Sequence, residues 1–334
     1  MLEELDYAEF LEQKFDALID ARSPLEYSHS HLNKALNFYA LNSEEHQEIG
    51  ILYKHNQAKA KAKGAEYICA NMAKHIPLFT DKFRIGAKIG IYCARGGLRS
   101  KSMAVILSEL GYRVVRLRGG FKAYRAYLND FFSKPLQCEL LVLCGNTACG
   151  KTELLELLGH SINLEKMANH LGSSFGDILG KQPSQKAFDE ALFYSMQTKL
   201  AFIESESRKI GKITLPLKLY EAMQKGFKIH CFASQEKRIE RIEKLYKIKM
   251  NEVNFYSSLR KISPYISLNL RLDLEDAFKK EQWQKLIAML LEYYDKSYKK
   301  SSQIHYELFT DNLLKAKEEL MALYEERLKV LKQF

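Results

Sequence analysis

Cysteine is scarce in this chain, and its few copies follow no ordered pattern. The six cysteines are scattered, and no two form a Cys-x-x-Cys pair. This arrangement excludes the disulfide framework of a small secreted protein and the ligand spacing of a zinc site. We therefore predict no metal site built from cysteine, and we interpret most of the six as small buried apolar side chains. They are Cys69, Cys93, Cys138, Cys144, Cys149 and Cys231.

Long hydrophobic runs are also missing. No apolar run approaches the roughly 20 residues that a membrane-spanning helix needs. The first twenty residues are acidic and interrupted by charges, unlike a signal peptide. We therefore expect a cytoplasmic protein without a membrane partner.

The chain has no acidic surplus. It carries 51 Lys and Arg against 41 Asp and Glu, a formal net charge of +10. A basic balance suits a polyanionic partner such as RNA, although it also suits solubility alone. The 334 residues, of which 46% are hydrophobic, suffice for two domains with separate cores.

Short apolar runs alternate with helical patterns in the first part of the chain. Residues Ala17–Asp20, Lys88–Tyr92 and Arg113–Leu117 read as buried strands. A helix-period segment separates the last two and stops at Gly111. Strand, helix and strand at this spacing predict a parallel α/β unit. A boundary is expected near residues 133–135.

A second α/β unit follows this boundary. Its predicted strands are Leu140–Cys144, Ala201–Ile203 and Lys228–Phe232. From about Gln235 onward the chain is mostly helical and highly charged. The last helix, from Asp311, carries a stripe of apolar residues that we interpret as a packing face.

A cysteine loop follows the predicted strand Lys88–Tyr92. Its sequence is Cys93-Ala94-Arg95-Gly96-Gly97-Leu98-Arg99-Ser100, and it leads into a helix. A cysteine before a helix N-terminus lies where backbone N–H groups converge, which favours the thiolate. The two glycines let the loop curl, and Arg95 and Arg99 add positive charge. This spacing fits a phosphatase-like loop or a rhodanese-like loop that carries sulfur on the thiolate.

The surroundings of this loop favour the second chemistry. Asp20–Tyr27, followed by His31, Ala35 and Asn37, resembles the opening block of rhodanese domains. Leu117–Arg125 resembles the stretch that closes them. Within the opening block, Asp20 and Arg22 are interpreted as a structural ion pair.

A phosphate-binding loop lies in the second unit. Residues 145–152 match G-x-x-x-x-G-K-[ST], after a strand and before a helix pattern. Glycines let successive amides ring a phosphate, a lysine neutralises it, and a hydroxyl can reach a metal. Glu204 and Glu206 follow a strand and are either carboxylates that assist a magnesium ion or part of a surface turn. The predicted phosphate ligands are Gly145, Asn146, Thr147, Gly150, Lys151 and Thr152.

The order of these two loops, with several further blocks, resembles the tRNA 2-selenouridine synthase family. The cysteine loop is similar to that family's C-x-R-G-G-x-R-S motif. Further similar blocks are Ala168–Gly176, Gln182–Phe188, Glu204–Gly211 with Leu215-Pro216, and Tyr293–Tyr298. Leu171 stands where this family commonly has an arginine, and Ala94 where it commonly has an aromatic residue.

The resemblance implies an activity on the 2-thiouridine of a tRNA wobble position. The thio group would be alkylated with geranyl diphosphate, and the S-geranyl group replaced using selenophosphate. Both reagents are co-substrates, so no tightly bound cofactor is expected, and a selenophosphate-supplying enzyme is a possible partner. The resemblance assigns catalysis to Cys93, Arg95 and Arg99. It implies that Asn169, His170, Ser173 and Ser174 line the diphosphate or the base. Arg208 would pair with the diphosphate or with Glu204, which is itself among the predicted cofactor-binding residues.

The predicted architecture is a rhodanese-like α/β domain over residues 1–132, a P-loop α/β domain over 138–234 and a helical region over 235–334. Two alternatives stay open at this level. One is a rhodanese-type sulfurtransferase whose P-loop binds ATP, and the other is a nucleotide-dependent regulator with a degenerate catalytic domain. The intact cysteine loop argues against the regulator.

Overall fold

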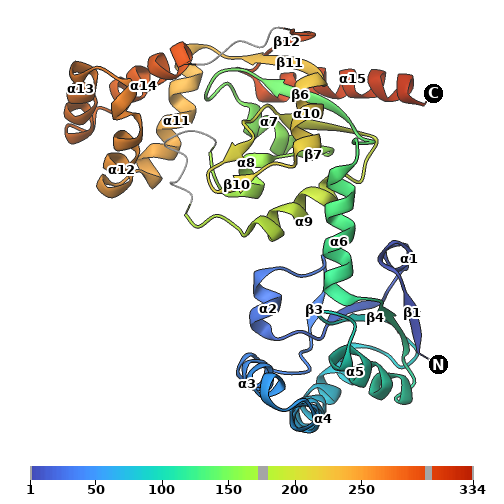
Figure 1. Cartoon of the computed structure of the whole chain (residues 1–334). Helices are drawn as coiled ribbons and strands as arrows, with labels where there is room; N and C mark the ends of the chain where they lie inside the picture. Colours follow the sequence, from blue (N-terminus) through green and yellow to red (C-terminus); the bar gives the residue numbers. More distant parts are fainter. Residues whose placement is uncertain (1, 172–179, 298–302, 333–334) are drawn as a thin grey trace. The chain divides into compact units, whose positions relative to one another are not determined.

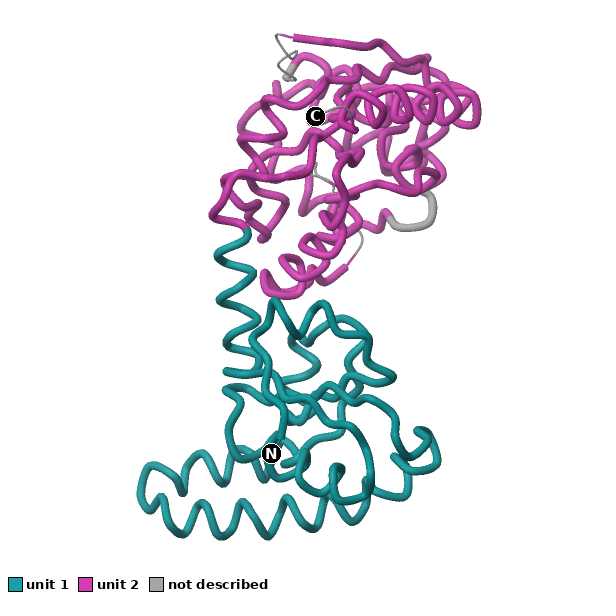
Figure 2. Tube along the Cα trace, turned by 90° about the vertical axis from the view of Figure 1, so that its right-hand side faces the viewer, with its two compact units in different colours: residues 1–131 teal, residues 132–334 magenta. Residues whose placement is uncertain are grey.

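The computed structural model describes residues 2–171, 180–297 and 303–332. The chain divides into two compact units, residues 1–131 and 132–334 (Figures 1 and 2). Each unit is built around its own five-stranded sheet. Within the described ranges, no helix combines the length and the apolar character needed to cross a membrane.

The first unit contains a parallel sheet in the order β1-β5-β4-β2-β3. The three strands predicted from apolar runs have the same bounds in the structure, because strands buried on both faces appear as continuous apolar segments. The strands are β1 (Glu3–Leu5), β2 (Ala17–Asp20), β3 (Leu36–Asn37), β4 (Lys88–Tyr92) and β5 (Arg113–Leu117).

Six helices complete this unit. The predicted helix between two strands is α5, and Gly111 beyond its end has the left-handed φ of 92° that favours glycine. The helices are α1 (Tyr7–Leu11), α2 (Pro24–His29), α3 (Ser43–His55), α4 (Gln57–Lys82), α5 (Leu98–Glu109) and α6 (Gly120–Ser133).

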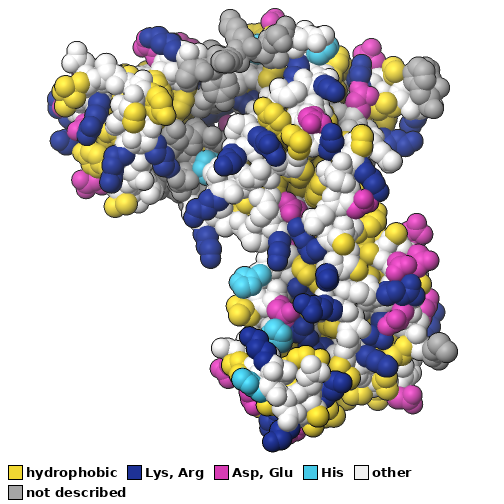
Figure 3. Space-filling model, viewed as in Figure 1, with side chains coloured by type: hydrophobic (Ala, Val, Ile, Leu, Met, Phe, Trp, Pro, Cys, Tyr) yellow, Lys and Arg dark blue, Asp and Glu magenta, His cyan; other side chains and the backbone are white. Residues whose placement is uncertain are grey.

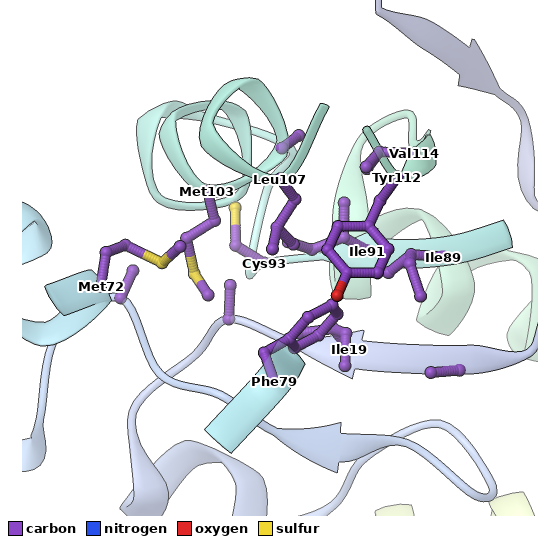
Figure 4. Close-up of a cluster of buried hydrophobic side chains, with 14 of the residues drawn as sticks. Ile19, Met72, Phe79, Ile89, Ile91, Cys93, Met103, Leu107, Tyr112 and Val114 are labelled. Carbon is purple, nitrogen blue, oxygen red and sulfur yellow. The ribbon is translucent and has the colours of Figure 1, made fainter. Parts of the chain in front are cut away.

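The core of the first unit lies between this sheet and the helices α4 and α5. Ile89 and Ile91 of β4 pack with Met103 and Leu107 of α5. Figure 4 shows Cys93 in the same cluster, next to these α5 side chains. Cys93, which directly follows the central strand β4, is therefore held by apolar packing on one side.

The second unit contains a parallel sheet in the order β12-β11-β6-β8-β7 and a separate antiparallel hairpin of β9 and β10. Strand β6 lies between β11 and β8, so its carboxyl end opens at the middle of the sheet. The strands are β6 (Glu139–Cys144), β7 (Ser161–Ile162), β8 (Leu200–Glu204), β9 (Lys209–Ile210), β10 (Ile213–Thr214), β11 (Phe227–Phe232) and β12 (Tyr306–Phe309).

Helices α7 and α15 pack on one face of this sheet, where they share an apolar cluster with β6, β8 and β11. Helices α11 to α14 enclose a second apolar cluster of their own. The helices are α7 (Lys151–Leu157), α8 (Leu164–Ala168), α9 (Gln185–Ser195), α10 (Leu217–Lys225), α11 (Gln235–Lys249), α12 (Glu252–Ile262), α13 (Leu268–Lys279), α14 (Trp283–Ser297) and α15 (Leu313–Leu331), with a short 3-10 helix at Ser263–Tyr265.

The structure differs from the predicted helical region 235–334 beyond α14. Strand β12 pairs in parallel with β11, and α15 packs Leu320 and Tyr324 against the sheet. The end of the described chain therefore belongs to the P-loop sheet. Strand β12 was missed because it is a short edge strand in which only Leu308 is buried, so it has no continuous apolar run.

Candidate functional site

Cys93 directly follows β4 and precedes the N-terminus of α5. Its side chain is only 2% exposed, and the Ser100 hydroxyl donates a hydrogen bond to its sulfur at 3.2 Å. The backbone N–H groups of residues 94–97 donate to no acceptor in the described part of the chain. A sulfur with a hydroxyl donor, beside open amides at a helix N-terminus, is set up to hold negative charge.

The carbonyl groups of this loop are bound from behind. The N–H groups of Phe121 and Lys122, in the first turn of α6, donate to the carbonyls of Cys93 and Ala94 at 2.8 and 3.0 Å. Arg116 of β5 donates to the Gly96 carbonyl at 2.6 Å. Because the carbonyls have these partners, the amides are left for an anion on the other side.

The close approach of Gly120, in the closing block, to the cysteine loop explains why this position is a glycine. Gly120 has a φ of 58°, and a Cβ there would lie 2.1 Å from the Cys93 carbonyl oxygen. A side chain at this position would push α6 away from the cysteine loop. The Gly119-Gly120 pair therefore fixes the loop that carries Cys93.

The two predicted catalytic arginines have different environments. Arg99 forms an ion pair with Glu26 of α2 at 2.6 Å. Burial alone would raise the pKa of Glu26, but the Arg99 guanidinium lowers it to about 2. Arg95 is exposed and forms no ion pair with any described residue, so its charge faces solvent at the mouth of the loop.

Asp20 and Arg22 form a buried ion pair at 2.6 Å, as the sequence predicts. The Arg22 guanidinium also lies 3.8 Å from the ring centre of Phe121, and Tyr92 donates to Asp20 at 2.7 Å. Burial, together with the Asp20 charge, raises the pKa of Tyr92 well above its usual value. This network ties the opening block to β4 and to the closing block.

The phosphate-binding loop joins β6 to α7 in the second unit. Lys151 donates to the carbonyls of Gly145 and Asn146 at 2.9 and 3.1 Å, and so spans its own loop. The backbone N–H groups of Thr147, Ala148 and Gly150 donate to no acceptor in the described ranges. These amides and the lysine form the cradle that a phosphate requires.

The carbonyls of this loop also have partners behind it, and sequence reasoning missed them. Arg238 donates to the Thr147 carbonyl at 2.9 Å and Arg241 to the Ala148 carbonyl at 3.1 Å. Thr310 donates to the Cys149 carbonyl at 2.6 Å. The two arginines are three residues apart on α11, so they lie on the same face of this helix. This spacing was the signal in the sequence that could have identified them.

Asp295 of α14 holds Arg238 with two hydrogen bonds of 2.8 and 2.7 Å. This contact accounts for the aspartate of the Tyr293–Tyr298 block. Tyr293 and Tyr294 pack against the apolar cluster of α11 to α14, and Tyr298 lies outside the described residues. Leu171 packs against the same cluster, which accounts for an apolar residue at that position.

A chain of carboxylates begins at the hydroxyl of Thr152. Thr152 donates to Glu165 at 2.9 Å, and the Glu165 backbone N–H donates to Glu204 at 2.7 Å. Burial, followed by the nearby Glu165 carboxylate, raises the pKa of Glu204 to about 8 and that of Glu206 to about 7. Glu204 is fully buried, so a surface turn is the wrong interpretation for this residue.

The remaining predicted residues are dispersed. His170 is buried beside the end of α8, and Asn169 donates to the Lys181 carbonyl at 3.1 Å. Arg208 is exposed just before β9 and forms no ion pair with Glu204. Ser173 and Ser174 lie outside the described residues.

All six cysteines are free, and Cys149 inside the phosphate-binding loop is buried, as expected for a small space-filling side chain. No group of three or more His, Cys, Asp or Glu side chains with metal-binding geometry occurs in the ranges that the structure describes.

Comparison with protein families matches both units. Residues 5–127 match the rhodanese-like domain, and residues 138–259 match the tRNA 2-selenouridine synthase AAA domain. Among solved structures, an N-terminal domain from Clostridium difficile 630, described as part of an ATP/GTP binding protein, is 32% identical. The match covers 38% of this chain and 98% of the solved domain, with a TM-score of 0.35.

Curated relatives named tRNA 2-selenouridine synthase match across both units. The protein of Pseudomonas syringae pv. tomato is 36% identical over 234 residues, which are 67% of this chain and 64% of that protein. The match to this relative thus spans slightly less than two thirds of its length. The protein of Pseudomonas aeruginosa is 31% identical over 290 residues, which are 82% of this chain and 78% of that protein.

The cysteine loop lies in the part of the chain that matches the rhodanese-like domain, and the phosphate cradle lies in the part that matches the tRNA 2-selenouridine synthase AAA domain. The resemblance and the α/β fold predicted from the sequence are thereby confirmed, and the chain belongs to the tRNA 2-selenouridine synthase family.

Proposed function

We propose that this protein converts 2-thiouridine at the wobble position of tRNA to 2-selenouridine through an S-geranylated intermediate. In the first step the thio sulfur attacks C1 of geranyl diphosphate, a C–S bond forms, and diphosphate leaves with the electron pair. In the second step selenium replaces the S-geranyl group. The overall exchange consumes selenophosphate and water and releases geranylthiol and phosphate, so atoms and charges balance.

The observation that carries this proposal is the pairing of two anion cradles of different chemistry in one chain. The P-loop offers open amides and the Lys151 ammonium group. The Cys93 loop offers open amides and a sulfur nucleophile. A diphosphate leaving group needs the first cradle, and selenium transfer from an anionic donor needs the second.

In the alkylation step, the P-loop residues Gly145, Asn146, Thr147, Gly150, Lys151 and Thr152 bind the diphosphate. Lys151 neutralises charge that grows as the C1–O bond breaks, so its contribution is larger in the transition state than in the ground state. Sulfur carrying a geranyl group then leaves the base more readily than a thiocarbonyl sulfur.

In the selenium step, the Cys93 thiolate attacks the phosphorus of selenophosphate, so that an S–P bond forms, the P–Se bond breaks and hydroselenide leaves. Hydroselenide then displaces geranylthiolate at C2 of the base, and water hydrolyses the S–P bond and releases phosphate. Ser100 and the open amides stabilise its thiolate. Arg95, exposed at the mouth of the loop, attracts the anionic selenium donor, whereas Arg99 is held by Glu26 and fixes the loop.

Magnesium fits this site only with help from the diphosphate. The described carboxylates form no three-ligand cluster, yet Glu204 has one buried oxygen without a partner and lies next to the Thr152–Glu165 contact. Magnesium is commonly held by one or two protein oxygens together with substrate phosphates. Thr152 and Glu204 would supply these oxygens, and the ion would neutralise the leaving diphosphate.

The test is nucleoside mass spectrometry of 2-thiouridine-containing tRNA incubated with the protein, geranyl diphosphate, magnesium and selenophosphate. The wild-type protein is expected to form 2-selenouridine. Cys93→Ala should accumulate the S-geranylated nucleoside, and Lys151→Ala should leave 2-thiouridine unchanged because it cannot bind the diphosphate.

A matched control is Cys69→Ala, which changes an exposed cysteine on α4 that belongs to neither loop. It should behave as the wild type does. Unchanged 2-thiouridine with the wild-type protein under every condition would refute the proposal and favour a nucleotide-linked sulfurtransferase.

A further inference from the structure

The Gln182–Gln185 block has no role in the chemistry above, but its contacts are specific. The Gln182 side chain donates to the carbonyls of Ala168 and Ile210, both at 3.0 Å, and accepts from the Lys212 backbone N–H at 2.7 Å. Gln185 donates to the Thr214 carbonyl at 3.0 Å and accepts from the Thr214 N–H at 2.9 Å. Two glutamines thus bind the backbone of the β9–β10 hairpin on both strands.

The tip of the hairpin is fitted to this support. Gly211 has a φ of 57°, and a Cβ there would lie 2.2 Å from the Gln182 side-chain oxygen and 2.8 Å from the His170 ring. Any larger residue would displace the glutamine or the histidine. The hairpin is therefore held in one position relative to the end of α8.

The fixed hairpin carries a group of positive charges. Arg208, Lys209 and Lys212 are exposed on it, and Lys181 is exposed on the adjoining segment. We call these four residues the hairpin cluster. Figure 3 shows Lys and Arg side chains gathered on the face of the molecule that carries β10 and α9.

These charges have no acidic partners in the part of the chain that the structure describes. Two exposed lysines of the same unit are by contrast paired, Lys218 with Glu221 at 2.9 Å and Lys280 with Asp276 at 2.9 Å. A group of unpaired cations on a rigid element repels itself, and an external anion relieves that repulsion.

A chain of contacts links the tip of the hairpin to the P-loop. The Gly211 tip adjoins His170, whose backbone N–H donates to the Glu165 carbonyl at 3.0 Å, and Glu165 accepts from Thr152. The chain that leads to the hairpin also leaves β8 next to β6, because the Ser205 N–H donates to the Leu143 carbonyl at 2.8 Å. The contacts from the hairpin tip to the phosphate cradle thus pass through His170, Glu165 and Thr152.

We propose that the hairpin cluster binds the RNA phosphates that flank the nucleoside to be modified, and so delivers the base to the P-loop. A single diphosphate would need fewer and more buried donors, whereas exposed cations spread along a hairpin match a run of backbone phosphates. This inference rests on the proposed function and adds to it the surface that receives the RNA.

The test compares two triple variants. One replaces cluster lysines (Lys181→Ala, Lys209→Ala, Lys212→Ala), and its control replaces exposed lysines elsewhere in the unit (Lys279→Ala, Lys285→Ala, Lys315→Ala). Both remove the same charge. Binding of a labelled anticodon stem-loop that contains 2-thiouridine is measured by fluorescence anisotropy from about 50 to 300 mM salt, the range in which phosphate contacts dominate affinity.

The cluster variant should bind roughly ten- to thirtyfold more weakly at about 100 mM salt, with a slope of log K against log salt smaller by about 2, since each lost phosphate contact contributes about 0.7 in single strands. The control variant should match the wild type. Calorimetric binding of geranyl diphosphate should be unchanged in both, which shows that the P-loop is intact.

If the cluster variant binds RNA as tightly as the control variant while the wild-type protein still forms 2-selenouridine, the inference is wrong and the proposed function stands. If the wild-type protein binds no RNA at any salt concentration tested, the proposed function fails, and this inference fails with it.

Discussion

The Ser100 hydroxyl donates a hydrogen bond to the Cys93 sulfur at 3.2 Å. An intramolecular hydrogen bond typically contributes about 0.5–1.5 kcal/mol. We therefore expect Ser100→Ala to slow alkylation of Cys93 by iodoacetamide about three- to tenfold, because the sulfur loses the hydroxyl group that donates a hydrogen bond to it. The rate is measured by mass spectrometry in a Cys69→Ser background, since Cys69 is the exposed cysteine.

Ser102→Ala provides the control for this prediction, because Ser102 lies on the same helix without contacting the sulfur. Equal alkylation rates in the Ser100 and Ser102 variants would show that the hydroxyl does not support the thiolate.

Glu204 makes the stability of the P-loop unit depend on pH. Its pKa in the folded protein is raised to about 8 by burial and by Glu165, so the folded state retains a proton that the unfolded state releases near pH 4.5. The free energy of unfolding should therefore fall as pH rises from about 4.5 to about 8. Glu204→Gln should remove this decrease in the free energy of unfolding, because a glutamine side chain does not titrate.

Thermal unfolding tests this sign. Glu204→Gln should raise the Tm at pH 8 relative to the wild type by about 2–4 °C for each kcal/mol recovered, and should change it little at pH 5. Glu307→Gln, at an exposed position of β12, is the control. A variant less stable than the wild type at pH 8 would contradict the raised pKa.

At the scale of secondary-structure elements, α11 and α14 act together on the P-loop. Arg238 of α11 binds the Thr147 carbonyl, and Asp295 of α14 fixes the Arg238 guanidinium. Asp295→Ala should loosen the peptide plane that directs the loop amides inward. We expect KM for geranyl diphosphate to rise about five- to tenfold, the equivalent of roughly one ordinary intramolecular hydrogen bond, with a smaller change in kcat.

Asp276→Ala breaks an exposed ion pair with Lys280 on α13 and should leave KM unchanged. Asp295→Asn retains one acceptor oxygen and should recover part of the affinity. A loss of the same size in the Asp276 variant would mean that the helical region affects the P-loop only through general stability.

At the scale of the whole molecule, each site is assembled from residues of one unit. The Cys93 loop is supported by Arg116, Phe121 and Lys122 within residues 1–131, and the P-loop by Arg238, Arg241 and Thr310 within residues 132–334. A defect in one loop should therefore leave the other loop intact.

An equimolar mixture of Cys93→Ala and Lys151→Ala proteins should consequently form 2-selenouridine, although neither variant does so alone. The geranylated tRNA made by the first variant can dissociate and be used by the second. Nucleoside mass spectrometry reads out the product. No product from the mixture, with geranylation by the first variant intact, would mean that the two steps must take place on one chain.

The sequence alone determined the strands Ala17–Asp20, Lys88–Tyr92 and Arg113–Leu117, the two loops and the family. Buried parallel strands are continuous apolar runs, and loops that bind anions require glycine and cations at fixed spacings, so both are local properties of the chain. The strand β12 lacked such a run, and its place in the sheet was therefore not predictable.

Only the tertiary structure decided what supports these loops. Arg238 and Thr310 meet the P-loop across 91 and 161 residues of sequence, respectively. The tertiary structure also gives the two arginines of the cysteine loop different environments. Arg99 forms an ion pair with Glu26, whereas Arg95 is exposed. Partners so far apart in sequence leave no periodic signal, because the folded backbone alone brings them together.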